Sequence, residues 1–232
     1  MTASTTTPRE RYRQQVRTEV KEKAWQQIAG SGASALSLNA IAKQMGMSGP
    51  ALYRYFANRD ELITELVTDA YRSLADTFAA VTTDGTGPER LAALAAALRG
   101  WAVADPHRYF LIYGTPVPGY HAPDDVTAIA SEMMSVLLDA CAAAIGAEPG
   151  AAPGAGTGAR DLDAHLAGHR EWADSHPDAP PAALRTALAF WSRLHGALSL
   201  ELAGHFTGMG LDPALLFAAE VAALTSPPTM TK

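Results

Sequence analysis

The sequence predicts an all-α protein with a small N-terminal helical unit and a larger C-terminal one. Three observations support this fold class. Apolar residues recur every three or four positions, as on one face of a helix, and β-branched runs are scarce. Stretches rich in Gly and Pro separate these periodic segments. The chain of 232 residues is 48% hydrophobic, which is enough for a core of ordinary size.

The predicted helices follow one another with no strand expected between them. Ser37, Ser48 and Asn58 are expected N-caps, because their side-chain oxygens can accept hydrogen bonds from the first amides of a helix. Gly30 and Gly46 are expected helix ends. Helices are expected over residues 9–29, 38–45, 49–56, 58–78, 88–104, 106–113, 124–145, 160–173, 181–205 and 212–224.

Breaks in composition suggest where the units begin and end. The sequence TTDGTGPER, residues 82–90, separates the early helices from the later ones. We expect a first domain over residues 9–57, a connecting helix over 58–80 and a second domain over 88–225. Residues 146–159, GAEPGAAPGAGTGA, form a low-complexity segment that is expected to be flexible.

The charge distribution is uneven along the chain. The formal net charge is -6, yet residues 1–59 carry nine Lys and Arg against three Glu, a net charge of +6. The remaining nine basic and 21 acidic residues give -12. A basic head on an acidic body is typical of proteins that bind nucleic acid, because phosphates attract the head and repel the body.

Residues 49–56, GPALYRYF, have two different faces on a helical wheel of 100° per residue. Leu52 and Phe56 fall together and are expected to face the core. The outward face carries Pro50, Tyr53, Arg54 and Tyr55. Such a ridge can enter a DNA groove, with its centre at the base edges and its flanking hydroxyls at the phosphates. Together with the preceding short helix and turn it predicts a helix-turn-helix.

The stretch LSLNAIAKQMGMSGPALYRYFANRDELITELV, residues 36–67, resembles the DNA-binding region of the TetR family of transcriptional regulators. The resemblance covers about residues 10–70 and implies that the third helix enters the major groove. It also implies phosphate contacts at the start of the second helix and at Arg59, and for Arg54 a base contact, with a phosphate contact as the alternative. The residues assigned to DNA are Ser37, Leu38, Ser48, Gly49, Pro50, Ala51, Tyr53, Arg54, Tyr55 and Arg59.

The rest of the chain, by the same resemblance, is expected to dimerise and to bind a small molecule. FWSRLHG at 190–196, preceded by HRYFLIYGTPVPGY at 107–120, is similar to the TetR C-terminal class that carries a Trp-His-Gly motif. An apolar cavity with few polar groups suits a hydrophobic or aromatic effector. The predicted pocket residues are Trp101, Tyr109, Phe110, Tyr113, Met133, Met134, Leu137, Trp191 and His195.

The helix over 181–205 has apolar residues on two faces, which indicates burial on both sides. One face is expected to meet the core or pocket, and the other to meet the second copy of a homodimer. The alternative is that this helix is simply central to a monomer core. The predicted dimer-interface residues are Leu184, Phe190, Leu198, Leu202, Leu215 and Ala219.

Other function classes find little support in the sequence. His165 and His169 are four residues apart, but the acid of a zinc protease motif is replaced by Leu166, and no functional metal or cofactor is expected. GAGTGA at 154–159 follows no predicted strand, which argues against a dinucleotide loop. No catalytic arrangement is predicted, so the protein is not expected to be an enzyme. Cys141 is interpreted as a core residue.

The sequence therefore predicts a homodimeric regulator of TetR type, bound to a near-palindromic DNA operator and released by a small hydrophobic ligand. The alternative is an all-α ligand-binding or interaction protein whose helix-turn-helix is only scaffold. No apolar run of 18 residues and no signal peptide are recognised, so a cytoplasmic protein without a membrane partner is expected.

Overall fold

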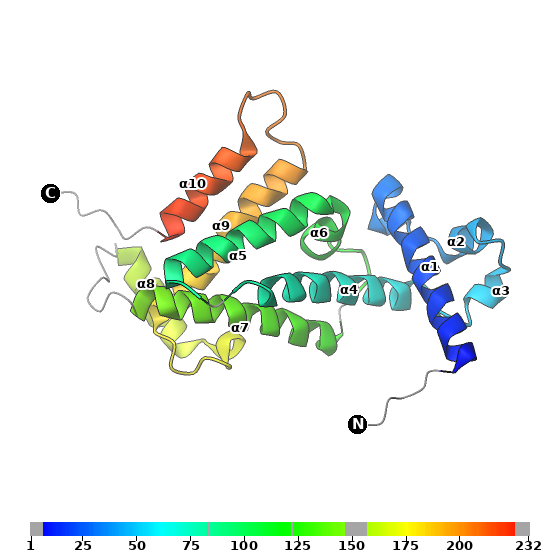
Figure 1. Ribbon diagram of the computed structural model, residues 1–232, viewed down its shortest axis with the longest axis horizontal. Coiled ribbons are helices and arrows are strands. Elements are labelled where there is room, and N and C mark those ends of the chain that lie inside the picture. Colours follow the sequence, from blue (N-terminus) through cyan, green and yellow to red (C-terminus); the bar gives the residue numbers. More distant parts are fainter. Residues whose placement is uncertain (1–6, 83, 122, 147–156, 226–232) are drawn as a thin grey trace. The chain divides into compact units, whose positions relative to one another are not determined.

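The computed structural model describes residues 7–82, 84–121, 123–146 and 157–225, and within these ranges it contains helices and no strand (Figure 1). The predicted all-α class is therefore confirmed. The helices are α1 (Pro8–Ser31), η1 (Ala33–Ala35), α2 (Leu38–Gln44), α3 (Gly49–Leu52), α4 (Arg59–Ala79), α5 (Gly87–Ala104), α6 (Pro106–Tyr113), α7 (Asp124–Gly146), α8 (Thr157–Gly168), η2 (Glu171–Ala173), α9 (Pro181–Leu202) and α10 (Pro213–Thr225).

The described chain forms two compact units. The first contains the described residues up to Ala70 together with those of His107–Val126, and the second contains Tyr71–Pro106 and the described residues from Thr127 onward. This division differs from the predicted boundaries of 57 and 88. The long helix α4 contributes residues to both units, and α6 with the loop after it belongs mainly to the first.

The first unit is built on the apolar face of α1. Val16, Val20, Ala24 and Ile28 are buried at the predicted four-residue spacing. A capping box begins α1, since Thr7 accepts from the amide of Glu10 while the Glu10 carboxylate accepts from Thr7.

Side-chain caps also begin two of the later helices in the first unit. The Ser37 hydroxyl accepts from the Ala40 amide at 3.3 Å, and Asn58 accepts from the Glu61 amide at 2.8 Å. The predicted caps Ser37 and Asn58 are thus confirmed, and they fix where α2 and α4 start.

The second unit is a helical bundle in which α9 packs against α5, α8 and α10. Figure 1 shows α5, α9 and α10 running side by side. A capping box of Thr86 and Glu89 begins α5. Its first residue, Gly87, is buried against the backbone of Ala144 near the end of α7.

Two predicted elements differ from the structure. The helix expected over 49–56 is α-helical only from Gly49 to Leu52 and continues as hydrogen-bonded turns through Tyr55. The helix expected over 160–173 starts earlier, at Thr157, and stops at Gly168 before the short η2. Most of the segment predicted to be flexible, residues 147–156, lies outside the described residues.

Helix α7 qualifies the expectation about membrane spans. By length and apolar composition alone, Val126–Gly146 could cross a bilayer, a property that core helices of soluble proteins share. The two acids within Val126–Gly146 have partners in the second unit. Glu132 accepts from Arg72 at 2.6 Å, and Asp139 lies 2.9 Å from the imidazole of His176. Met133, Leu137 and Leu138 are buried, as in a core helix.

Candidate nucleic-acid interface and effector region

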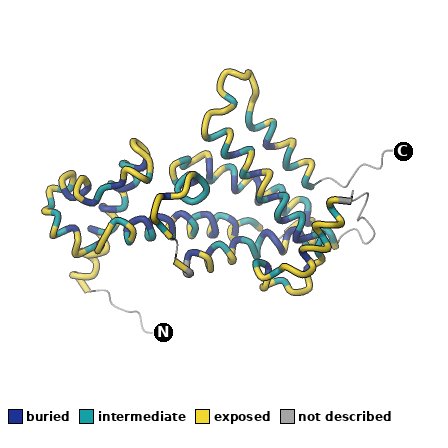
Figure 2. Tube along the Cα trace, turned by 180° about the vertical axis from the view of Figure 1, so that it is seen from behind, coloured by how far each residue is buried: buried dark blue, intermediate teal, exposed yellow. Residues whose placement is uncertain are grey.

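The α3 segment has the two faces that the helical wheel predicts. Leu52 and Phe56 are fully buried, whereas Pro50, Tyr53 and Arg54 are exposed, with 44% of the Tyr53 surface accessible. Figure 2 shows buried and exposed positions alternating along the helices of the chain. The two buried side chains anchor the segment, so its outward ridge is held on the surface.

Residues at the start of α3 leave polar groups open to solvent. Ser48 occupies the N-cap position and is exposed, but its side chain makes no cap hydrogen bond, so its hydroxyl can serve another acceptor or donor. Gly49 is half-buried, and a Cβ there would lie 3.3 Å from the Asn39 side-chain oxygen. Pro50 is within the first turn of the helix, where its missing N–H costs nothing.

The start of α2 corrects one of the predicted contacts. Leu38 is 4% exposed, so its side chain belongs to the core and does not reach a phosphate. Ser37 remains half-buried at the N-cap, and its backbone N–H donates to Gln27 of α1 at 3.0 Å. This contact holds the start of α2 against α1.

Arg59 has a structural role that was not predicted from the sequence. Its guanidinium donates to the backbone carbonyls of Ala33 at 2.9 Å, Leu36 at 3.2 Å and Ser34 at 3.3 Å. These carbonyls belong to η1 and to the residues around it, at the entrance to α2. Because these carbonyls engage Nε and Nη2 of the guanidinium, Arg59 supports this turn, and its predicted phosphate contact stays a prediction.

Ion pairs between α1 and α4 reduce the free positive charge of the first unit. Lys21 of α1 pairs with Glu65 and, at 2.7 Å, with Asp69 of α4, and Arg17 pairs with Glu61 and Glu65. Over residues 1–70 the chain has nine basic and seven acidic residues, a net charge of +2. Much of the positive charge of residues 1–59 is therefore offset by acids of α4. The exposed Arg54 supports DNA binding more directly than the net charge of the unit does.

The predicted effector residues are distributed over both units. In the first unit, Tyr109 is fully buried on α6 and its ring lies 5.5 Å from Phe110 and 5.4 Å from Tyr113, between centroids. In the second unit, the Trp101 indole donates to the Ser73 hydroxyl at 3.1 Å. Met133 and Leu137 are buried on α7, and Met134 is half-buried.

Trp191 and His195 lie together on α9, with ring centroids 4.3 Å apart. Burial lowers the pKa of His195 to about 4, so its imidazole is neutral at pH 7. The assignment of these side chains to an effector pocket stays a prediction.

Three of the six predicted dimer residues are buried within one chain. Leu184, Phe190 and Leu198 are at most 1% exposed, because helices pack on α9 from more than one side and cover both of its apolar stripes. They are core residues, and their assignment to a dimer interface is wrong. Leu202 is half-buried, whereas Leu215 is 68% exposed and Ala219 is exposed on α10.

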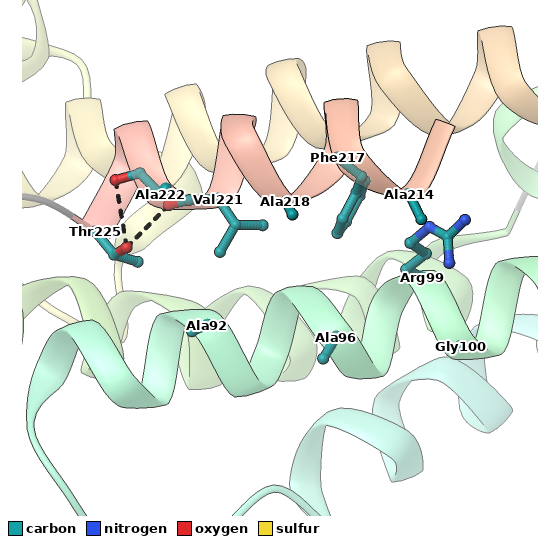
Figure 3. Close-up of a pocket in the computed structure, with 10 residues that line it drawn as sticks. All are labelled: Ala92, Ala96, Arg99, Gly100, Ala214, Phe217, Ala218, Val221, Ala222 and Thr225. Carbon is teal, nitrogen blue, oxygen red and sulfur yellow. Dashed lines mark hydrogen bonds between the residues drawn. The ribbon is translucent and has the colours of Figure 1, made fainter. Parts of the chain in front are cut away.

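A groove between α5 and α10 was not expected from the sequence. Its volume is about 560 Å³, and Arg99 and Phe217 lie toward one end of it, as Figure 3 shows. Arg99 donates to Glu201 of α9 at 2.5 Å. None of the predicted effector residues lines it. The lining consists of Ala92, Ala96, Arg99, Gly100, Ala214, Phe217, Ala218, Val221, Ala222 and Thr225.

Two histidine arrangements bear on metal or catalytic chemistry. The rings of His165 and His169 stack with centroids 4.0 Å apart, and the described residues contain no group of three His, Cys, Asp or Glu side chains placed to hold a metal. His176 lies 2.9 Å from both the Ser175 hydroxyl and the Asp139 carboxylate. Sequence patterns did not predict this second arrangement, because Asp139 is 37 residues from His176.

The fold and the exposed α3 ridge define a helix-turn-helix protein of the DNA-binding class. Residues 22–66 match the family described as bacterial regulatory proteins, tetR family, and residues 91–224 match the tetracyclin repressor-like C-terminal domain. The chain belongs to the TetR family and is a DNA-binding transcriptional regulator. The finer assignment to a Trp-His-Gly class stays a prediction.

Named relatives and solved structures agree with this membership. The chain is 35% identical over 219 residues to the HTH-type transcriptional regulators Rv1816 of Mycobacterium tuberculosis and Mb1846 of Mycobacterium bovis, with 92% of each chain covered. It is 64% identical to the crystal structure of SCO4313, named as a regulatory protein, with a TM-score of 0.81 over 94% of this chain and 98% of that one.

A more distant structure shows the same fold. A regulatory protein of the tetR family from Rhodococcus RHA1 has 17% identity and a TM-score of 0.62, over 90% of this chain and 94% of that one. Family membership decides between the two function classes in favour of the regulator. TetR-family regulators bind DNA and dimerise through the C-terminal domain, the family implies a soluble cytoplasmic protein, and transcriptional regulators are not a class of enzymes.

Proposed function

We propose that this regulator is a homodimeric repressor that leaves a near-palindromic operator when a small hydrophobic or aromatic effector binds. The observation that supports it best is the α3 ridge, in which exposed Pro50, Tyr53 and Arg54 stand over buried Leu52 and Phe56. An anchored ridge with one cation and a phenol fits a major groove, where a cation reads base edges and a hydroxyl meets phosphate.

Residues around the ridge extend the proposed DNA contact. Ser48 offers an exposed hydroxyl that its own helix does not use, and Gly49 and Ala51 are small enough for close backbone approach. Tyr55 is half-buried, and we propose that the exposed part of its ring contacts DNA. Ser37 lies at the N-cap of α2, where we propose a phosphate contact. Leu38 and Arg59 support this surface from within, and we do not place them on DNA.

The proposed dimer uses the exposed apolar surface of α9 and α10. Leu215 and Leu200 are 68% and 45% exposed, and Ala219 lies on the same helix as Leu215. Large apolar side chains left in water favour association. A two-fold dimer would set the two α3 segments about 34 Å apart, one turn of DNA, which gives a near-palindromic operator.

We propose an apolar effector because the residues predicted to line its pocket are mostly apolar. Met133 and Leu137 are buried, Trp101 and Trp191 are aromatic, and His195 is neutral at pH 7. Residues of this kind bind a hydrophobic or aromatic molecule without requiring it to carry charge. We propose that effector binding favours a second conformer and that α4, which belongs to both units, transmits the change.

The test is a nuclease footprint on the DNA flanking the protein's own gene. We expect a protected region with two half-sites whose centres lie about 10 base pairs apart. Titration with aromatic probes such as indole should then lower the fraction of DNA bound. Absence of any protected sequence would contradict operator binding. A probe that binds the protein, measured by isothermal titration calorimetry, yet leaves DNA affinity unchanged would contradict the release mechanism.

A further inference from the structure

The C-terminal end of the helix-turn-helix is held by a side chain of α1. Arg17, in the middle of α1, donates from Nη1 to the backbone carbonyl of Tyr55, 38 residues away. Its guanidinium carbon also lies 4.2 Å from the centroid of the Phe56 ring. One cation thus contacts both the backbone and the buried anchor of the segment that carries Tyr53 and Arg54.

The other side of the same guanidinium is tied to α4. Nη2 of Arg17 donates to Glu65, and lies 3.5 Å from Glu61. Only 16% of the Arg17 side chain is exposed. A planar guanidinium has several N–H donors in a fixed arrangement, so it can bridge a carbonyl and two carboxylates at once, which an ammonium cannot reproduce.

The residues that follow Phe56 are fixed by α4 as well. The amide of Ala57 donates to the Glu61 carboxylate at 2.5 Å, and the Glu61 amide donates to Asn58 at 2.8 Å. Glu61 therefore serves both Arg17 and the link between α3 and α4. Each residue from Tyr55 to Asn58 is therefore held in place by a contact with Arg17 or Glu61.

We propose that Arg17 is a positioning residue for DNA binding, which sets the orientation of the α3 ridge and does not contact DNA. This rests on the proposed placement of α3 in the groove. The α-helix ends at Leu52, so residues 53–56 depend on turns and on Arg17 for their conformation. Without the guanidinium, fewer molecules hold the ridge in the binding orientation, and apparent affinity falls by that fraction.

The salt dependence of binding separates positioning from phosphate contact. The charge of Arg17 is already balanced by Glu65 and Glu61, so little of it remains for DNA. Each phosphate contact contributes about one to the slope of log affinity against log salt concentration. Loss of a positioning residue lowers the affinity and leaves that slope unchanged.

The experiment compares Arg17→Lys and Arg17→Met with Lys21→Met in the full-length protein. Lys21 is the matched control. It also joins α1 to α4, through Glu65 and Asp69, but its ion pairs do not involve residues 53–57. Hydrogen exchange of the amides of residues 53–57 is measured first, without DNA. We expect faster exchange there in both Arg17 variants, and wild-type exchange in Lys21→Met.

Operator affinity is then measured over a salt series. We expect both Arg17 variants to bind about tenfold more weakly with the wild-type slope, and Lys21→Met to stay within about twofold. Wild-type exchange in Arg17→Lys, or a slope reduced by about one in Arg17→Met, would overturn the proposal. If Arg17→Met does not fold, Arg17→Lys decides. Failure of the wild-type protein to bind any operator would refute the proposed function, while the exchange result still decides the role of Arg17.

Discussion

The indole of Trp191 and the imidazole of His195 lie one helical turn apart on α9, with ring centroids 4.3 Å apart and planes inclined by 57°. Burial lowers the pKa of His195 from its ordinary value of 6.5 to about 4. The imidazole is therefore kept neutral, and its protonation works against the folded state.

This depressed pKa predicts a loss of stability on mild acidification. As the pH falls below 6.5, the unfolded chain binds a proton at this histidine while the folded chain does not, so stability falls until about pH 4. Between pH 7.5 and 5 the contribution is roughly 2 kcal/mol. Urea unfolding at the two pH values should show that His195→Gln loses less stability than the wild type. His205→Gln, at an exposed position, is the control and should keep the wild-type difference.

Gly87 and Gly100 on α5 predict opposite effects of a methyl group. A Cβ on Gly87 would lie 2.1 Å from the backbone nitrogen of Ala144, whereas one on Gly100 would meet nothing within 4 Å. We expect Gly87→Ala to destabilise the protein by roughly 1–3 kcal/mol, through overpacking against backbone that cannot move aside. Gly100→Ala should be neutral or stabilising, since Ala favours a helix by about 1 kcal/mol. Equal unfolding free energies for the two variants would refute the close crossing of α5 and α7.

Arg59→Ala is expected to weaken DNA binding indirectly. The variant removes the Arg59 hydrogen bonds to the carbonyls of Ala33, Ser34 and Leu36, and the Ala33 carbonyl keeps only the amide of Leu36, so the turn before α2 loosens and the free energy of unfolding falls. Thermal unfolding and operator affinity should both decrease, with an unchanged salt slope. A slope reduced by about one together with an unchanged melting temperature would instead restore Arg59 as a phosphate contact.

Leu215→Asp tests the proposed dimer surface. This side chain is 68% exposed, so the change should leave a single chain folded but place a charge where the second copy would bind. Sedimentation velocity should show a shift from dimer toward monomer, and operator affinity should fall because the two half-sites are no longer bound together. Leu162→Asp on α8 is the control. Unchanged sedimentation of Leu215→Asp would place the interface elsewhere.

Local patterns predicted much of the fold. The caps at Ser37 and Asn58, the four-residue spacing on α1, and the burial of Leu52 with exposure of Arg54 all follow from neighbouring residues. Such features depend on helix geometry alone, so the spacing of residues along the sequence is enough to predict them.

Contacts between distant residues could not be predicted in the same way. Nothing local shows that Arg17 reaches Tyr55, or that Arg59 reaches Ala33, because these partners are 38 and 26 residues away. The face of α9 was misassigned for a related reason. Two apolar stripes are compatible with one core and one partner, and only the packing around α9 shows that Phe190 lies inside.

The central claim is that the α3 ridge binds DNA through Arg54 and Tyr53, and operator affinity across a salt series tests it most directly. Arg54→Ala should weaken binding and reduce the salt slope, because the guanidinium displaces counterions from DNA, while Tyr53→Phe should weaken binding at constant slope, because it removes only a neutral hydroxyl. Both side chains are exposed, so neither variant should lower the melting temperature. Wild-type affinity and slope in both folded variants would contradict the claim.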